Sequence, residues 1–254
     1  VLGGTLSQMG AKKITKLMDH AVRTGCPIIG IADSGGARIQ EGILSLDGFA
    51  DIFYHNELAS GVVPQITASI GPSAGGAVYS PAMTDFVVMV EKAGTMYVTG
   101  PEVVKTVLGE EVSFEELGGA ITHGTKSGVA HFVAKNEYDC FDKIKTLLSY
   151  IPSNNTDEPP HVVSDDDPNR VDHNLINKIP ENSLQPYDMK EILLSVVDNH
   201  QLFEIHELFA QNVIVGFARM NGRTVGIVAN QPIYLAGALD IDSSNKAARF
   251  IRYC

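Results

Sequence analysis

The sequence predicts an α/β protein built around a largely parallel sheet. Apolar runs of strand length alternate with helical patterns over residues 1 to about 150. This alternation is typical of βαβ units, in which neighbouring strands run parallel. Hydrophobic residues make up 44% of the 254 residues and charged residues 19%. A chain of that composition can bury a large core, which excludes global disorder.

The spacing of apolar residues predicts the elements of this first part. Residues 12–23 predict an amphipathic helix, because apolar side chains recur three and four positions apart (Ile14, Leu17, Met18, Ala21 and Val22). The short apolar run at residues 27–32 predicts a buried strand. The further expected elements are helices at about 43–60, 102–107 and 138–148, and strands at 64–70, 86–90 and 96–99.

The composition changes after residue 151. Residues 152–190 hold six of the twelve prolines and an acidic run at 165–167, which is typical of a surface connector. A helix is expected at 191–197. Strands are expected at 212–220 and 223–229, on either side of Asn221-Gly222, a pair that supplies the positive φ angles of a type I′ hairpin turn. The predicted division is a first domain (1–151), a connector (152–190) and the start of a second domain (191–254).

A weak internal repeat relates the two ends of the chain. A shift of 233 positions aligns Gly4 with Gly237, Leu6 with Leu239, Lys13 with Lys246 and Leu17 with Phe250. The second copy would then carry a helix with the apolar face Ala247, Phe250, Ile251 and Cys254. Chance matches of this size are common, so the repeat is an expectation for the structure to test. If it holds, the chain ends inside its second domain.

Charge, histidine and cysteine content narrow the class of function. The formal net charge of −11 argues against non-specific nucleic-acid binding, and no apolar stretch reaches the roughly 18–20 residues of a transmembrane segment. The first residues lack the features of a signal peptide. The eight histidines show no metal-ligand spacing, so no metal site is expected. Cys26, Cys140 and Cys254 form no pair of metal-binding or disulfide spacing, which favours a cytoplasmic protein.

Two Gly-Gly pairs follow expected strands directly, in Ser34-Gly35-Gly36-Ala37-Arg38 and at Gly75-Gly76. Glycine after a parallel strand lets the backbone approach a ligand, and free amides at a following helix can bind negative charge. The plain alternative is that these glycines only permit tight turns. Two pairs at equivalent places favour a binding site for an oxyanion.

A second interpretation concerns Ser73. Residues 71–75 match G-x-S-x-G, the motif that presents the nucleophile of α/β-hydrolases. Ser73 would then need an acid and a histidine, for example Asp85 with His123 or His131. The motif is short, and no oxyanion loop of the HGGG type precedes it, so this hydrolase interpretation is the alternative.

The sequence as a whole resembles the carboxyltransferase subunits of biotin-dependent acyl-CoA carboxylases, especially propionyl-CoA carboxylase β and its methylmalonyl-CoA decarboxylase and transcarboxylase relatives. The resemblance covers essentially the whole chain and is carried by residues 34–42, 75–86, 99–101, 109–120, 215–223, 230–232 and 237–241. It implies a crotonase-like fold used twice. The first domain would be nearly complete with its start missing, and the second would be truncated.

The resemblance also implies a reaction and a site. Carboxybiotin would donate its carboxyl group to the α-carbon of a short-chain acyl-CoA, with propionyl-CoA giving methylmalonyl-CoA. The reverse reaction, in a decarboxylase or transcarboxylase, is the alternative, and a crotonase-like hydratase or isomerase is less favoured. The amides of Gly75 and Gly76 would form the oxyanion hole for the acyl thioester. Candidate substrate-binding residues are Ser34, Gly35, Gly36, Ala37 and Arg38.

Further expectations concern charge and partners. Arg38 and the lysines Lys12, Lys13 and Lys16 are candidates for positive potential toward the phosphates of CoA, unless the lysines are merely solvated. Biotin would be carried on a partner and not bound covalently here, and its oxyanion hole would lie beyond Cys254. Partners would be biotin carboxylase and biotin carboxyl carrier components, in a hexameric assembly. The location would be the cytoplasm, or the mitochondrial matrix in a eukaryote.

Overall fold

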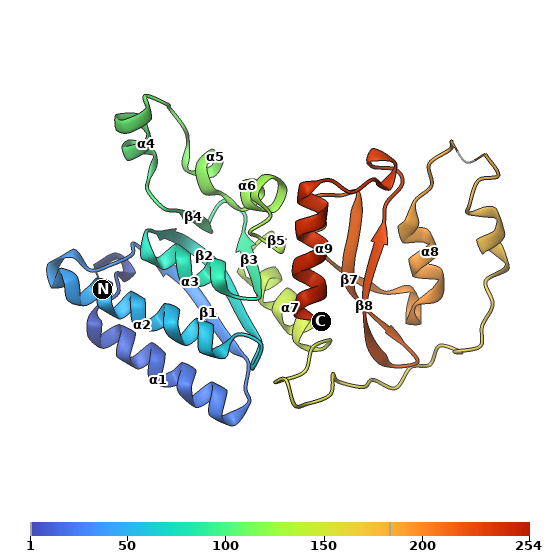
Figure 1. Cartoon of the computed structure of the whole chain (residues 1–254), viewed down its shortest axis with the longest axis horizontal. Helices are drawn as coiled ribbons and strands as arrows, with labels where there is room; N and C mark the ends of the chain where they lie inside the picture. Colours follow the sequence, from blue (N-terminus) through green and yellow to red (C-terminus); the bar gives the residue numbers. More distant parts are fainter. Residues whose placement is uncertain (1, 183) are drawn as a thin grey trace. The chain divides into compact units, whose positions relative to one another are not determined.

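The computed structural model describes residues 2–182 and 184–254, and its chain forms two compact units (Figure 1). Unit 1 runs to Thr146 and includes Pro152–Asp157, and unit 2 comprises Leu147–Ile151 and Glu158–Cys254. The division at residues 146–158 lies close to the expected end of the first domain, while the finer boundaries at 152 and 190 stay predictions.

Unit 1 is a parallel α/β layer, as the alternation of strands and helices predicts. Its sheet has the order β1-β2-β3-β5, and β4 pairs with the end of β2; every pairing is parallel. The strands are β1 (Ile28–Ser34), β2 (Gln65–Ala74), β3 (Phe86–Val90), β4 (Thr95–Tyr97) and β5 (Phe132–Ala134). The helices are α1 (Gln8–Thr24), α2 (Ile43–Ala59), α3 (Gly76–Met83), α4 (Pro101–Leu108), α5 (Phe114–Gly118), α6 (Ala120–Thr122) and α7 (Glu137–Leu148).

Strand β1 differs from the expected buried strand. It lies at the edge of the sheet, where Ile29 is 46% exposed and Ile31 60% exposed. Only its other face is covered, and there Ile28 packs against a small core of Ala11, Met18 and Ile52. The expectation was wrong because an apolar run shows that a strand can be buried and says nothing about its place in the sheet.

Helix α1 forms where the sequence predicts it but buries only part of the expected apolar face. Met18 and Ala21 are buried, whereas Ile14 and Leu17 are exposed. The side chain of Ser7 caps the helix by accepting from the Gly10 N–H, and Gly25 ends it in the left-handed conformation. Because α2 packs along the other side of α1, the side that carries Leu17 has no cover in the part of the chain that the structure describes.

Unit 2 contains an antiparallel sheet of order β6-β7-β8, with β6 (Leu202–Ile205), β7 (Val213–Met220) and β8 (Arg223–Asn230). The turn between β7 and β8 is the predicted hairpin: Asn221 has φ 50° and Gly222 has φ 76°. Helix α8 (Met189–Val196) begins two residues earlier than expected, at the N-cap Asp188. Helix α9 (Ile241–Tyr253) ends the unit.

The proline-rich segment from Glu158 onward is bound to unit 2. Arg170 pairs with Asp166 at 2.7 Å and donates to the carbonyl oxygens of Ser195 and Val197 at the end of α8. Lys178 donates to the carbonyl oxygen of Glu191, which lies in α8. These side-chain contacts hold a segment that has little regular secondary structure of its own.

The internal repeat is confirmed. Leu2, Gly3 and Gly4 have φ values of 52°, 63° and 68°, and 233 positions later Leu235, Ala236 and Gly237 have 48°, 52° and 70°. The helices that follow begin at Gln8 and Ile241, again 233 positions apart. Three successive left-handed residues are uncommon, so their recurrence at this offset cannot be dismissed as a chance alignment.

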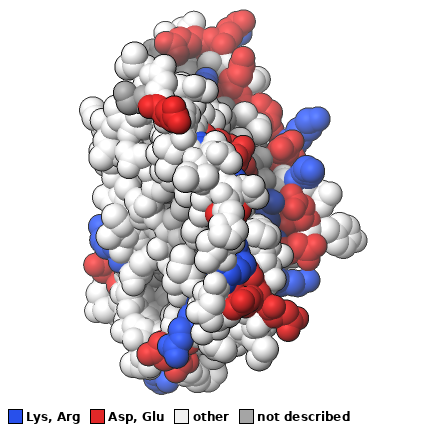
Figure 2. All heavy atoms as spheres, turned by 90° about the vertical axis from the view of Figure 1, so that its right-hand side faces the viewer, with Lys and Arg blue, Asp and Glu red and all other residues white. Residues whose placement is uncertain are grey.

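No helix in the two described stretches has both the length and the apolar character needed to span a membrane. The face of the molecule in Figure 2 is largely uncharged; its acidic side chains are interspersed with Lys and Arg, without a continuous basic surface.

Candidate functional site

The two glycine motifs meet at the carboxyl ends of β1 and β2. These strands are neighbours in parallel register, with Ser34 opposite Ser73. A Cβ atom placed on Gly36 would lie 2.7 Å from the carbonyl oxygen of Ala74 and 3.8 Å from the Cα of Gly75. Gly36 also has φ +94°. Both the close approach and the backbone conformation therefore require glycine at this position.

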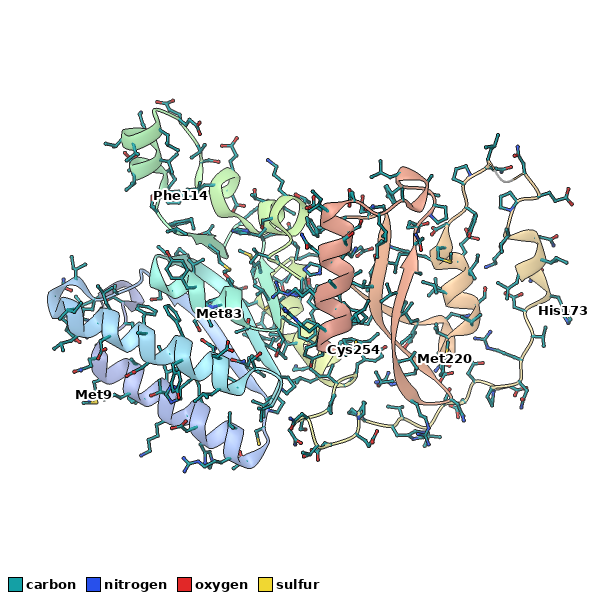
Figure 3. All side chains as sticks on the ribbon, viewed as in Figure 1. Met9, Met83, Phe114, His173, Met220 and Cys254 are labelled. Atoms are coloured by element: carbon teal, nitrogen blue, oxygen red, sulfur yellow. The ribbon has the colours of Figure 1, made fainter. Side chains whose placement is uncertain are left out.

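The Gly75-Gly76 pair starts helix α3, which ends at Met83 (Figure 3). Gly75 has φ 55° and ψ −131°, a conformation open almost only to glycine, and its N–H donates to the carbonyl oxygen of Tyr97 at 3.3 Å. Gly76 is the first helical residue, so its N–H has no acceptor one turn earlier in the helix. Of the two predicted oxyanion donors, Gly76 thus has the freer amide, while that of Gly75 is engaged.

Phe49 of α2 explains why position 76 is a glycine. A Cβ on Gly76 would lie 2.9–3.0 Å from the ring of Phe49, which is itself buried. The ring packs directly under the first turn of α3. The sequence motif alone did not identify Phe49, because nothing in α2 signals which helix start it will meet.

The first glycine loop is tied to the segment that precedes α1. The N–H of Gly35 donates to Gly3, the N–H of Leu6 to Gly36, and the N–H of Arg38 to Leu6, at 2.8–2.9 Å. The hydroxyl of Ser34 donates to the carbonyl oxygen of Gly4 and accepts from the N–H of Gly36. Ser34–Arg38 are therefore held in a fixed arrangement beside the turn at Gly75.

Arg38 supports the loop through its side chain. Its Nη2 donates to the carbonyl oxygen of Thr5 at 3.0 Å, and its Nη1 pairs with Glu41 at 3.2 Å. The other carboxylate oxygen of Glu41 accepts from the N–H of Gln8 at 2.8 Å. Both terminal nitrogens of the guanidinium thus bind the scaffold of the site, and Glu41 is a further residue that the motif analysis missed. Lys12, Lys13 and Lys16 lie exposed on α1.

The structure contradicts the hydrolase interpretation. Ser73 is fully buried, and its hydroxyl has no hydrogen-bond partner. His123 contacts Ser127 and the carbonyl oxygen of Met96, and His131 accepts from the N–H of Val87. A buried serine hydroxyl that no base contacts cannot serve as an activated nucleophile. Among the described residues, no group of three or more His, Cys, Asp or Glu side chains could hold a metal ion.

Comparison with known proteins identifies the family. The carboxyl transferase domain matches residues 1–254. The chain belongs to the carboxyl transferase domain family. It is 55% identical, over 254 residues, to the propionyl-CoA carboxylase beta chain of Roseobacter denitrificans, and 52% identical to the methylmalonyl-CoA decarboxylase subunit alpha of Veillonella parvula. Each match covers 100% of this chain and 50% of the relative.

A solved structure shares the fold. The transcarboxylase 12S crystal structure, described as a hexamer assembly with hydrolyzed methylmalonyl-coenzyme A bound, matches with a TM-score of 0.97 and 45% identity. The match covers 100% of this chain and 50% of that chain. The expected crotonase-like α/β fold is confirmed, and the chain spans about half the length of the relatives that it matches.

Proposed function

We propose that the protein containing this chain transfers a carboxyl group between carboxybiotin and the α-carbon of a short-chain acyl-CoA, with propionyl-CoA as the acceptor and methylmalonyl-CoA as the product. One observation carries the proposal: the turns at Gly36 and Gly75 meet at the carboxyl ends of β1 and β2, so closely that a Cβ on Gly36 would collide with the carbonyl oxygen of Ala74. The propionyl-CoA carboxylase beta chains among the relatives support the choice of acceptor.

The chemistry explains why backbone amides suit this site. Removal of the α-proton turns the thioester into an enolate whose negative charge rests on the thioester oxygen. A fixed N–H donor at that oxygen stabilises the transition state, and loss of one such donor typically costs about 3 kcal/mol. In our proposal the Gly76 N–H is such a donor and the turn at Gly75 holds it in place. We therefore assign Gly75 a positioning role and not that of a second donor, because its own N–H already donates to the carbonyl oxygen of Tyr97.

The surrounding loops complete the proposed acyl-CoA site. Ser34, Gly35, Gly36 and Ala37 would line the thioester, and Arg38 would fix the loop and not touch the substrate, since it already binds Thr5 and Glu41. Biotin would be attached to a partner, and its carboxylated form would supply the carboxyl group. We assign no residue of this chain to biotin.

The proposed partners follow the family: biotin carboxylase and biotin carboxyl carrier components, with further copies of this subunit in a hexamer. The transcarboxylase 12S structure is described as a hexamer assembly, which supports that oligomeric state. We also propose a cytoplasmic location for a prokaryotic source, because the relatives are bacterial and archaeal.

The reverse direction is the second candidate. Methylmalonyl-CoA decarboxylase alpha subunits are 50–52% identical to this chain, close to the identity of the propionyl-CoA carboxylase beta chains. The glycine turns would serve either direction equally, since both pass through the same enolate. The other subunits of the assembly would then decide the direction.

Exchange of Gly76 for valine tests the proposal. In the assembled enzyme, Gly76→Val should lower the rate of propionyl-CoA carboxylation roughly 100-fold or more, because the valine displaces the donor and collides with Phe49. Ser73→Ala, three positions away, is the matched control and should stay within a few-fold of the parent. Loss of turnover in Ser73→Ala, or an unchanged rate in Gly76→Val, would overturn the assignment. Circular dichroism of both variants separates loss of chemistry from loss of fold.

A further inference from the structure

Strand β4 lies beside the last residues of β2, immediately before the second glycine turn. Residues 72–74 stand in parallel register with residues 95–97. The carbonyl oxygen of Tyr97 faces the turn and accepts from the N–H of Gly75 at 3.3 Å. The place of this three-residue strand therefore sets the place of Gly75, and with it that of the Gly76 N–H.

The carbonyl oxygen of Met96, the middle residue of β4, accepts from the ring of His123. The distance from Nε2 to this oxygen is 2.7 Å, and the contact spans 27 positions of the chain. Because successive carbonyl groups of a strand point to opposite sides, Tyr97 binds the glycine turn while Met96 binds the histidine. His123 thus holds β4 from the side opposite the glycine turn.

The second ring nitrogen of His123 fixes the direction of this hydrogen bond. Nδ1 lies 2.7 Å from the hydroxyl oxygen of Ser127. A carbonyl oxygen can only accept, so Nε2 carries the proton, and in the neutral ring Nδ1 accepts from the Ser127 hydroxyl. The Ser127 oxygen also accepts from the N–H of Val129 at 3.3 Å. The ring is therefore held with its donor directed at Met96.

The backbone around His123 brings the ring close to β4 (Figure 1). His123 begins a π-helical turn that ends at Ser127, a rare conformation that is frequent at functional sites. A Cβ on Gly118 would overlap with the carbonyl oxygen of Met96, so only glycine allows this approach. Gly119 forms an antiparallel bridge with the first residue of β4. The Gly118-Gly119 pair, which the proposed oxyanion site does not use, thus seats His123 against β4.

The side chain of Met96 provides a second link between β4 and α3. It is 1% exposed and belongs to one apolar cluster with Val78, in the first turn of α3, and with Ala120 of α6. The N–H of Val78 donates to the carbonyl oxygen of Gly75 at 3.0 Å. A shift of β4 would therefore move the start of α3 through this packing as well as through the hydrogen bond between Tyr97 and Gly75.

We infer that His123 is a positioning residue of the oxyanion site: it holds β4 in the place from which Tyr97 fixes the glycine turn, and so directs the Gly76 N–H at the thioester oxygen. The inference rests on the proposed function, in which that amide stabilises the enolate. His123 acts through Met96 and makes no contact with the substrate. A displaced donor loses much of its effect, because it must lie at hydrogen-bond distance from the oxygen on which charge develops.

Substitution of His123 in the assembled enzyme tests the inference. His123→Leu removes the donor and should lower kcat for propionyl-CoA carboxylation about ten-fold, while KM for propionyl-CoA stays within about three-fold of the parent. His123→Gln keeps an amide N–H donor near the place of Nε2 and should restore kcat to within about three-fold of the parent. Lys126→Leu, at an exposed position of the same π-helical turn, is the matched control and should have the parental kcat.

Amide hydrogen exchange gives a readout that needs no turnover. A peptide that spans residues 73–80 contains the Gly75 N–H, which the hydrogen bond to Tyr97 protects. His123→Leu should speed exchange in this peptide at least about five-fold, whereas His123→Gln and Lys126→Leu should leave it at the parental rate. Residues 86–90 of β3 should exchange at the parental rate in every variant, which shows that the fold is retained.

Four results would overturn the inference. They are an unchanged kcat in His123→Leu, an equally low kcat in His123→Leu and His123→Gln, a rise in KM without a change in kcat, which would make the ring a substrate-binding group, and unchanged exchange at residues 73–80. Faster exchange at residues 86–90 in His123→Leu would also contradict it, because the ring would then support the whole sheet. A parental rate in Gly76→Val would instead reject the proposed function, and the exchange rates would still decide whether His123 holds the glycine turn.

Discussion

Arg38 shows how much one side chain contributes to the arrangement of the candidate site. It binds the carbonyl oxygen of Thr5 and the carboxylate of Glu41, and Glu41 in turn binds the N–H of Gln8. The sequence places Arg38 in a glycine-rich motif and suggests a phosphate ligand. In the structure its side chain binds residues of the same chain, because the loop before α1 lies directly beside the motif.

We expect Arg38→Met to destabilise the first glycine loop by about 1–3 kcal/mol, because it removes the charge-assisted pair with Glu41 and the hydrogen bond to the Thr5 carbonyl oxygen. Urea unfolding of the chain measures the change. Arg23→Met, at an exposed site on α1 where the guanidinium contacts only its own helix, is the control and should change stability by less than about 0.5 kcal/mol. Equal midpoints for both variants would show that Arg38 does not support the loop.

Lys246 makes a prediction about pH. Burial lowers the pKa of Lys246 from 10.5 to about 8, a shift that nearby Glu204 and Glu207 oppose and Lys190 reinforces. Between these two values the unfolded chain holds a proton that the folded chain has released. The free energy of unfolding contributed by this group therefore rises with pH across that window. At neutral pH the buried charge still carries its desolvation cost.

Urea titrations of the parent and of Lys246→Met at pH 7 and pH 9.5 test this linkage. The difference in unfolding free energy, parent minus variant, should grow in favour of the parent as the pH rises. Lys12→Met, which removes an exposed lysine, should give a difference independent of pH. A Lys246→Met difference that stays constant, or that shrinks at pH 9.5, would show that Lys246 keeps an ordinary pKa.

At the scale of elements, the hairpin of β7 and β8 is the clearest success of local sequence information. Asn-Gly at positions 221–222 dictates a two-residue turn, and both residues have the required positive φ. The turn is also tied to its surroundings. The N–H groups of Asn221 and Gly222 donate to the carboxylate of Asp198, and a Cβ on Gly222 would collide with the carbonyl oxygen of Val162.

Gly222→Ala should therefore destabilise unit 2 by about 1–3 kcal/mol, from strain at positive φ together with the collision. Asn221→Gly is the matched control and should change stability by less than about 1 kcal/mol, since glycine adopts the same conformation. Thermal unfolding followed by circular dichroism reports both. If the alanine variant unfolded at the parental temperature, the turn would have to adopt a different conformation in solution.

The type and position of the other helices and strands were predicted well, but the faces that they bury were predicted less well. The strand at 86–90 and the helix at 43–59 lie where apolar spacing puts them. The apolar faces of α1 and α9 did not predict what covers them. Of the expected apolar face of α9, Phe250 is buried against β7, while Ile251 is exposed.

At the scale of the whole molecule, the chain spans half the length of its relatives, and the proposed reaction needs two anions to be stabilised. In the proposed function, the Gly76 N–H would stabilise the one on the acyl thioester, with the turns at Gly36 and Gly75 holding it in place. We therefore expect residues 1–254, expressed alone, to show no carboxyl transfer from carboxybiotin. The measurement is a transcarboxylation assay beside a version extended by about 200 residues at its C-terminus, a length that stays within the domain sizes typical of single folding units. Full activity of the shorter chain would show that it is a complete enzyme.

The sequence by itself determined the α/β class, the hairpin and the two glycine motifs, because each depends on residues close together in the chain. It also revealed the repeat, because a comparison of the two ends of the chain needs no contact between them. Propensity, apolar period and the need for glycine at positive φ act over a few positions. Tertiary structure alone decided that Gly36 meets Gly75, that Phe49 lies under Gly76, and that Arg38 binds Thr5 and Glu41. It also decided that Ser73 is buried without a base. Those contacts join segments separated along the chain, and strand order and helix packing, which no local pattern encodes, bring them together.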